Sequence, residues 1–113
     1  MDIPARAALL RIYTEEGRRD GAGALYESVV LKARDAGLAG ATVLRGPMGF
    51  GESARIHNAN ILDLSANLPL VIEIVDAEDK LRAFAGQIAG MNDIGLVTLE
   101  KVEVLHYGHA AGG

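Results

Sequence analysis

The sequence of 113 residues contains no cysteine and no tryptophan, and only two phenylalanines and three tyrosines. Without thiols it can form no disulfide, iron–sulfur cluster, thiolate metal site or cysteine nucleophile. Because half of the residues are apolar and few are aromatic, the core is expected to consist of Leu, Ile, Val and Ala. At this length we expect one domain spanning residues 1–113, with flexible ends at 1–5 and 108–113.

Charge and hydropathy argue against several further classes of protein. The formal net charge is −4, which is unusual for a nucleic-acid-binding protein. No apolar run approaches the roughly 20 residues of a membrane-spanning helix. The N-terminal segment lacks the basic start and apolar stretch of a secretory signal. We therefore expect a cytoplasmic protein that does not insert into a membrane.

Apolar periodicity predicts the order β-α-β-β-α-β. With right-handed crossovers this order gives a ferredoxin-like α+β sandwich, in which one antiparallel sheet of four strands carries both helices on one face. Pro47 predicts that the second strand lies at an edge or is bulged. In the last strand the apolar residues change from odd-numbered to even-numbered positions, which predicts a bulge near Glu100 and Lys101. The expected strands are 6–14, 41–51, 68–76 and 96–107, the helices are about 22–36 (with Asp20 near its N-cap and Gly37 as its C-cap) and 77–89, and 52–67 is a long loop.

The sheet face without helices is expected to be apolar, which predicts association with further copies of the chain. Arg11 is central on this face and is expected to form a satisfied ion-pair network with Glu73 and Glu103. The alternative is a solvated cluster at the rim. The residues expected on the face are Leu9, Arg11, Tyr13, Val71, Glu73, Val75, Glu103 and Leu105.

The second strand carries Gly-Ala-Thr-Val at 40–43, followed by Met-Gly-Phe-Gly at 48–51. A threonine ahead of a Gly-Phe-Gly turn resembles the PII nitrogen-signalling proteins. Closer still is the resemblance to the PII-like family known as domain of unknown function 190, and it extends over roughly residues 7–107. The other segments that carry the resemblance are Arg11–Thr14, Leu25–Glu27, Leu68–Pro69, Val71–Val75 and Gly95–Glu100.

The resemblance implies a homotrimeric regulatory protein, with an adenine nucleotide bound between subunits and a mobile loop that acts on a partner. A membrane transporter or channel is the kind of partner that PII-type proteins regulate. Only His106 retains a donor where PII proteins have a basic pair in the last strand, so AMP or ADP is expected rather than ATP. The residues carried over to the site or placed near it are Thr42, Arg45, Gly49, Phe50, Gly51, Glu52, Ser53, Arg55, Gly95, Leu96, Val97, Thr98, Lys101 and His106.

Alternative interpretations of the same residues stay open. The glycines near Phe50 can serve a turn alone, and Arg18 and Arg19 are interpreted as ordinary surface charge. His57 lies in the expected loop, and His106 and His109 lie three apart on an extended strand or a frayed tail, so they do not preorganise a metal site. Ser53, His57 and Asp63 have the residue types of a catalytic triad, but all three lie in one loop that does not hold them rigidly. We therefore expect neither an enzyme nor a catalytic cofactor. The alternative function is a structural or CutA-like trimer without a nucleotide site.

Overall fold

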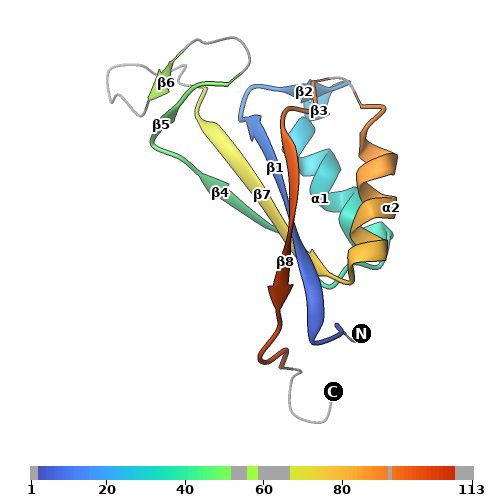
Figure 1. Cartoon of the computed structure of the whole chain (residues 1–113). Helices are drawn as coiled ribbons and strands as arrows, with labels where there is room; N and C mark the ends of the chain where they lie inside the picture. Colours follow the sequence, from blue (N-terminus) through green and yellow to red (C-terminus); the bar gives the residue numbers. More distant parts are fainter. Residues whose placement is uncertain (1–2, 52–55, 59–66, 92, 109–113) are drawn as a thin grey trace.

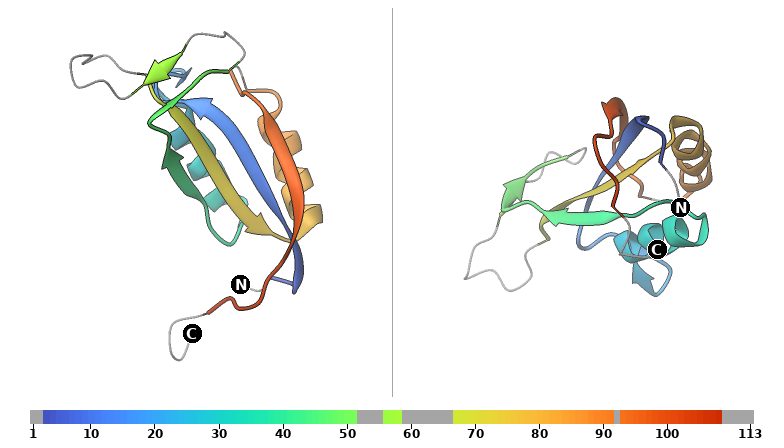
Figure 2. Two further views of the ribbon diagram at one scale, coloured as in Figure 1. Left: turned by 60° about the vertical axis from the view of Figure 1, so that its left-hand side comes forward. Right: turned by 90° about the horizontal axis from the view of Figure 1, so that it is seen from below.

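The fold is known from a computed structural model, which describes residues 3–51, 56–58, 67–91 and 93–108. One layer is a four-stranded antiparallel sheet with the order β4-β7-β1-β8 (Figure 1). Both helices cover one face of this sheet and leave the other face bare (Figure 2). This is the predicted ferredoxin-like sandwich, and β4 is an edge strand, as Pro47 indicated. The main elements are β1 (Arg6–Glu15), α1 (Leu25–Asp35), β4 (Thr42–Arg45), β7 (Pro69–Asp76), α2 (Glu78–Ile88) and β8 (Val97–Glu103).

The core lies between the sheet and the two helices. Along β1 and β7 alternate side chains point toward the helices, because successive side chains of a strand face opposite sides of the sheet. Leucine, isoleucine, valine and alanine fill this layer, and Phe84 of α2 is the one fully buried aromatic side chain among the described residues, with Tyr26 of α1 packed at its edge. The side chains buried there include Leu10, Ile12, Leu25, Val29, Ala33, Ile72, Ile74, Leu81, Phe84 and Ile88.

The ends of α1 differ in how well the sequence predicts them. At its C-terminus Gly37 has φ +77°, and the N–H groups of Gly37 and Leu38 donate to the carbonyls of Arg34 and Ala33. This is the expected glycine C-cap, in Schellman form. At the N-terminus Asp20 is not a cap. The segment before the helix instead forms a small hairpin of β2 (Arg19–Asp20) and β3 (Gly23–Ala24).

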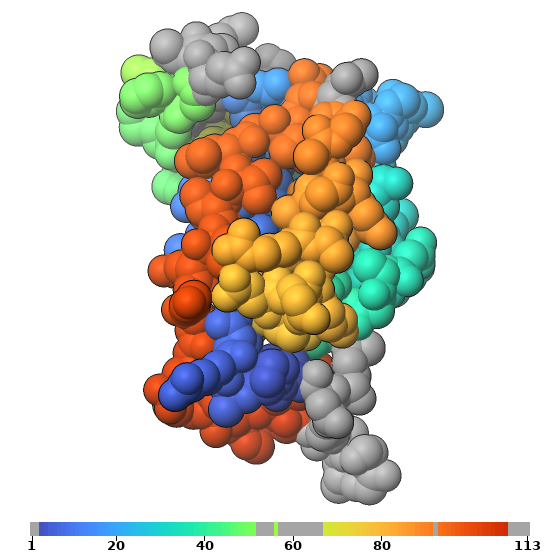
Figure 3. Space-filling model, turned by 45° about the vertical axis from the view of Figure 1, so that its right-hand side comes forward, coloured from blue at the N-terminus to red at the C-terminus, as the bar shows by residue number. Residues whose placement is uncertain are grey.

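The predicted bulge in β8 is wrong. The register with β1 runs without interruption from the pair Ile12–Val97 to the pair Arg6–Glu103. Val97 and Leu99 face the helix layer, where they pack on the core. Figure 3 shows the start of β1 and the end of β8 emerging beyond the helices. Lys101 occupies the next core-side position, exposed at the edge of the helix layer beside Glu78 at the start of α2, so the change in the apolar pattern needs no bulge.

The bare face carries the expected arginine network with one different partner. Arg11 Nε donates to Glu73 Oε2 at 2.9 Å, and Arg11 Nη1 donates to Glu100 Oε1 at 2.5 Å. The bond to Glu73 raises the pKa of Arg11 above its ordinary value. Glu103, which was expected in this role, pairs with Arg6 in the ladder, because the unbroken register assigns Glu100 to the face. The network is partly exposed, with 35% of the Arg11 side chain accessible.

One buried carboxylate joins the two halves of the core. Asp76 is fully buried at the end of β7. Its Oδ2 accepts from the N–H of Ala39 at 3.0 Å and lies 3.3 Å from Lys80 Nζ, and its Oδ1 accepts from the N–H of Ala77 at 2.7 Å. Lys80 Nζ also donates to the carbonyl of Gly37 at 3.2 Å. Asp76 therefore fastens the end of α1 to the beginning of α2.

Replacing Asp76 by Ala removes the acceptor of two backbone N–H groups and the carboxylate that pairs with Lys80. We expect the free energy of unfolding to fall by about 2–4 kcal/mol, measured by urea denaturation at a fixed protein concentration. Asp79→Ala is the matched control, since Asp79 is an exposed aspartate three residues away, in the first turn of α2, and it should change stability by less than about 1 kcal/mol. Equal losses in the two variants would contradict the role given to Asp76.

Candidate functional site

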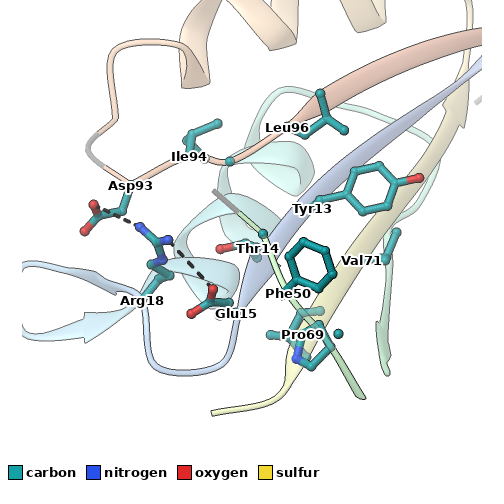
Figure 4. A pocket seen from close by; sticks show the side chains of 14 residues that line it. Tyr13, Thr14, Glu15, Arg18, Phe50, Pro69, Val71, Asp93, Ile94 and Leu96 are labelled. Carbon is teal, nitrogen blue, oxygen red and sulfur yellow. Dashed lines mark hydrogen bonds and ion pairs between the residues drawn. The ribbon is translucent and has the colours of Figure 1, made fainter. Parts of the chain in front are cut away.

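A pocket of about 710 Å³ lies where the end of β1 meets the beginnings of β7 and β8 (Figure 4). The turn after β5 (Met48–Gly49), which pairs with β6 (His57–Asn58), closes one side of it. The segment leading into β8 closes another. The lining residues are Tyr13, Thr14, Glu15, Arg18, Gly49, Phe50, Gly51, Pro69, Leu70, Val71, Asp93, Ile94, Gly95 and Leu96.

One end of the pocket is apolar and aromatic. In Figure 4 the Phe50 ring lies among Pro69, Val71 and Tyr13. Phe50 is 70% exposed, so its ring is available for stacking with a planar group of a ligand. A Cβ at position 49 would lie 3.2 Å from Pro69 Cγ, which explains why a small residue there lets the turn approach β7. This end suits an aromatic ring.

The other end of the pocket is charged. Arg18 Nη1 donates to Asp93 Oδ1 at 3.2 Å, and Arg18 Nη2 lies 3.8 Å from Glu15 Oε1. Arg18 is the one cation among the lining residues that the structure describes. Figure 4 shows the guanidinium between the two carboxylates, on the side away from Phe50. A guanidinium is a good partner for phosphate or carboxylate.

The hydroxyl of Thr14 lies between these two ends. Thr14 is 8% exposed, and among the described residues its Oγ1 is a buried side-chain atom with no hydrogen-bond partner. In Figure 4 the hydroxyl points toward the side occupied by Glu15 and Arg18. An unpaired buried hydroxyl is costly, and because its oxygen is buried, a ligand supplies a partner only if the side chains around Thr14 move.

Gly95 sets the distance between two walls of the pocket. A Cβ at this position would lie 2.2 Å from the carbonyl oxygen of Tyr13, closer than any side chain tolerates. The N–H of Tyr13 donates to the carbonyl of Leu96 at 2.8 Å. Only glycine allows the chain entering β8 to lie this close to β1.

The comparisons with known proteins identify the family. The pattern of the family DUF190, described as "Uncharacterized ACR, COG1993", matches residues 7–104. The chain belongs to the DUF190 family. This confirms the family resemblance carried by the sequence motifs.

Relatives of this DUF190 chain cover most of its length. Two proteins of Aquifex aeolicus (strain VF5), each named "UPF0166 protein", are similar to it. One is 39% identical over 98 residues, which is 87% of this chain and 92% of the relative. The other is 35% identical over 101 residues, which is 88% of this chain and 97% of the relative.

A solved structure shares the fold. CPII of Thiomonas intermedia K12, in a structure bound to ADP and bicarbonate, superposes with a TM-score of 0.63. The two chains are 16% identical, and the match covers 88% of each. At this identity the likeness shows a common PII-like fold.

Five of the predicted binding residues line the pocket: Gly49, Phe50, Gly51, Gly95 and Leu96. Three more, Glu52, Ser53 and Arg55, lie outside the described residues. The other six lie away from the pocket in the single chain. They are Thr42, Arg45, Val97, Thr98, Lys101 and His106.

The structure gives the DUF190 chain other surroundings for these six residues. Arg45 pairs with Glu16, with 2.7 Å between Nη2 and Oε2. Val97 packs on the core, and Lys101 lines a second cavity at the opposite end of β1. Thr42 and Thr98 lie on the bare face and His106 is exposed beyond β8, so contact with a nucleotide remains a prediction for them.

Sequence reasoning missed the charged end of the pocket. Arg18 was interpreted as surface charge, and nothing in the local sequence indicates that it meets Asp93. Thr14 and Tyr13 carried a signal, since they end the first strand beside the expected turn.

Among the described residues no group of three His, Asp or Glu side chains could hold a metal ion. In the same part of the chain no helix is long and apolar enough to cross a membrane.

Adding one methyl group at Gly95 should separate the walls of the pocket. Gly95→Ala places a Cβ against the Tyr13 carbonyl, and we expect the free energy of unfolding to fall by about 1–3 kcal/mol. Gly86→Ala is the control, because a Cβ there meets nothing within 4 Å and should stabilise α2 by about 0.4–1 kcal/mol. Urea denaturation measures both, and an unchanged midpoint for Gly95→Ala would refute the close contact.

Proposed function

We propose that this DUF190 chain is a PII-like regulatory protein that binds an adenine nucleotide, AMP or ADP rather than ATP, in the pocket of Figure 4. One observation carries the proposal. The Gly-Phe-Gly turn and the segment 93–96 meet in a single cavity that has an exposed aromatic face at one end and a guanidinium at the other.

The two ends match the two parts of a nucleotide. A base stacks on Phe50, and stacking on an aromatic side chain contributes about 1–3 kcal/mol. The phosphate then lies toward Arg18, and the sugar lies between the two ends. The protein that shares the fold, CPII, was solved with ADP bound, which supports the same ligand class here. These groups hold and orient a ligand, so we propose binding without turnover.

We propose further that three chains associate through the bare sheet face. Leu9 faces Val75 and Tyr13 faces Val71 across the strand pair, and these apolar pairs flank the Arg11 network. Burying them against other copies removes apolar surface from water. The same association would bring a second subunit over the exposed rim of the pocket, as the resemblance to PII proteins implies.

The partner contact is proposed for the loop 52–67. Residues 52–55 and 59–66 of this loop lie outside the described residues, and the chain on either side of it reaches the pocket, at Gly51 and Pro69. Occupancy of the pocket can therefore change what this segment presents to another protein. A membrane transporter or channel is the proposed kind of partner.

Thermal unfolding with AMP, ADP and ATP, with and without magnesium, tests nucleotide binding. At about 100 times its dissociation constant a ligand should stabilise the native state by roughly 2.7 kcal/mol. Phe50→Ala should weaken AMP binding about tenfold or more, because a stacked base loses its platform. Leu31→Ala, which removes an exposed apolar side chain from α1, is the control.

The outcomes separate two functions. A shift with AMP or ADP that Phe50→Ala reduces and Leu31→Ala preserves supports the regulatory protein. The absence of a shift with every nucleotide would overturn it and favour the CutA-like trimer without a nucleotide site.

Val75→Asp tests the association. A carboxylate placed opposite Leu9 on the bare face cannot be buried without a partner, so we expect the trimer to dissociate into single chains. Sedimentation velocity measures the species. Leu31→Asp puts the same charge on the exposed surface of α1 and should leave the trimer intact. A wild-type protein that sediments as a single chain would contradict the proposed assembly.

A further inference from the structure

Two carboxylates already occupy the guanidinium at the charged end of the pocket. Asp93, from the segment before β8, faces Arg18 Nη1, while Glu15, from the end of β1, faces Nη2. These lining groups together carry a formal charge of −1. A site built only to attract phosphate would not place two acids against its cation.

We propose that Asp93 sets the charge selectivity of this pocket by competing for Arg18, so that a nucleoside monophosphate binds in preference to a triphosphate. This inference rests on the proposed nucleotide-binding function. It adds a residue that selects among nucleotides by repulsion, and Asp93 is not among the residues that the family resemblance carried over.

The exposure of the two acids decides which one a phosphate replaces. The Asp93 side chain is 54% exposed, whereas that of Glu15 is 13% exposed. Asp93 can return to water at little cost, because exposed ion pairs are weak. A single phosphate therefore takes over Nη1 while Glu15 keeps Nη2. Each further phosphate adds negative charge within about one Debye length of both carboxylates, so the carboxylates repel it.

The charged end of the pocket is partly enclosed. The side chain of Arg18 is 30% exposed and that of Glu15 is 13% exposed. The hydroxyl of Thr14 lies on the same side of the pocket (Figure 4), but its oxygen is buried, so a ligand reaches it only if the side chains around it move. The charged end is thus more than a cluster of surface ions.

The backbone at Asp93 offers a clean substitution. Asp93 has φ +67°, a left-handed conformation that asparagine adopts as readily as aspartate. Asp93→Asn therefore preserves the shape of the turn and removes only the charge. Asp79→Asn is the matched control, because it makes the same change at an exposed position of α2, outside the pocket.

Titration calorimetry of the full chain with AMP and with ATP, without magnesium, tests the proposal. We expect the wild type to bind AMP more tightly. Asp93→Asn should narrow the ratio of the two dissociation constants by about fivefold or more, because one repelling charge near the added phosphates is gone. The wild-type ratio should also shrink as salt is raised, and that of Asp93→Asn should depend less on salt. Asp79→Asn should match the wild type.

The possible outcomes distinguish a failure of this inference from a failure of the proposed function. A narrowed ratio with weakened salt dependence supports Asp93 as the selecting residue. A ratio unchanged in Asp93→Asn, with AMP still bound, overturns this inference and leaves the proposed function standing. If neither nucleotide binds to the wild type or the variant, the proposed function fails and the inference fails with it.

Discussion

The pocket depends on the close approach of two backbones, at Gly95 and Tyr13. With only hydrogen atoms on its α-carbon, Gly95 lets the chain entering β8 lie against the Tyr13 carbonyl, and the bond from Tyr13 N to Leu96 O holds it there. This contact fixes β8 beside β1 at the end of the sheet where the Gly-Phe-Gly turn and β7 also meet. The Gly-Phe-Gly turn packs separately on Pro69, so the pocket is built from strand ends and from the turns beside them.

The central strand β1 divides its side chains between two tasks. Leu10 and Ile12 enter the core, whereas Arg11 and Tyr13 face away from the helices. The core side needs only aliphatic bulk, which explains how a chain so poor in aromatic residues forms a closed interior. The bare side combines apolar residues with an arginine bound by two glutamates. Covering this face with another copy therefore buries no unpaired arginine, but the three groups together carry a formal charge of −1.

Much of the fold follows from local patterns, and the charged part of the site does not. Period-2 alternation and the glycine at 37 predict strands and a helix end, because these depend on neighbouring residues. Glu100 replaces Glu103 beside Arg11 since register is set by pairing across the sheet, and a shift of one residue exchanges faces. The pair Arg18–Asp93 joins residues 75 positions apart. No helical or strand periodicity in the sequence relates these two residues, so their pairing is visible only in the folded chain.

Tyr13 belongs to both surfaces on which the proposals rest. Its side chain lies on the bare face opposite Val71, and both residues also line the pocket. A subunit placed over this face would therefore contact residues that a nucleotide also contacts. Binding free energies of two ligands that share residues are coupled, and the coupling is reciprocal. A nucleotide that favours association must then bind more tightly to the assembled protein. In the proposed trimer, a nucleotide bound at Tyr13 would therefore change the strength of subunit association.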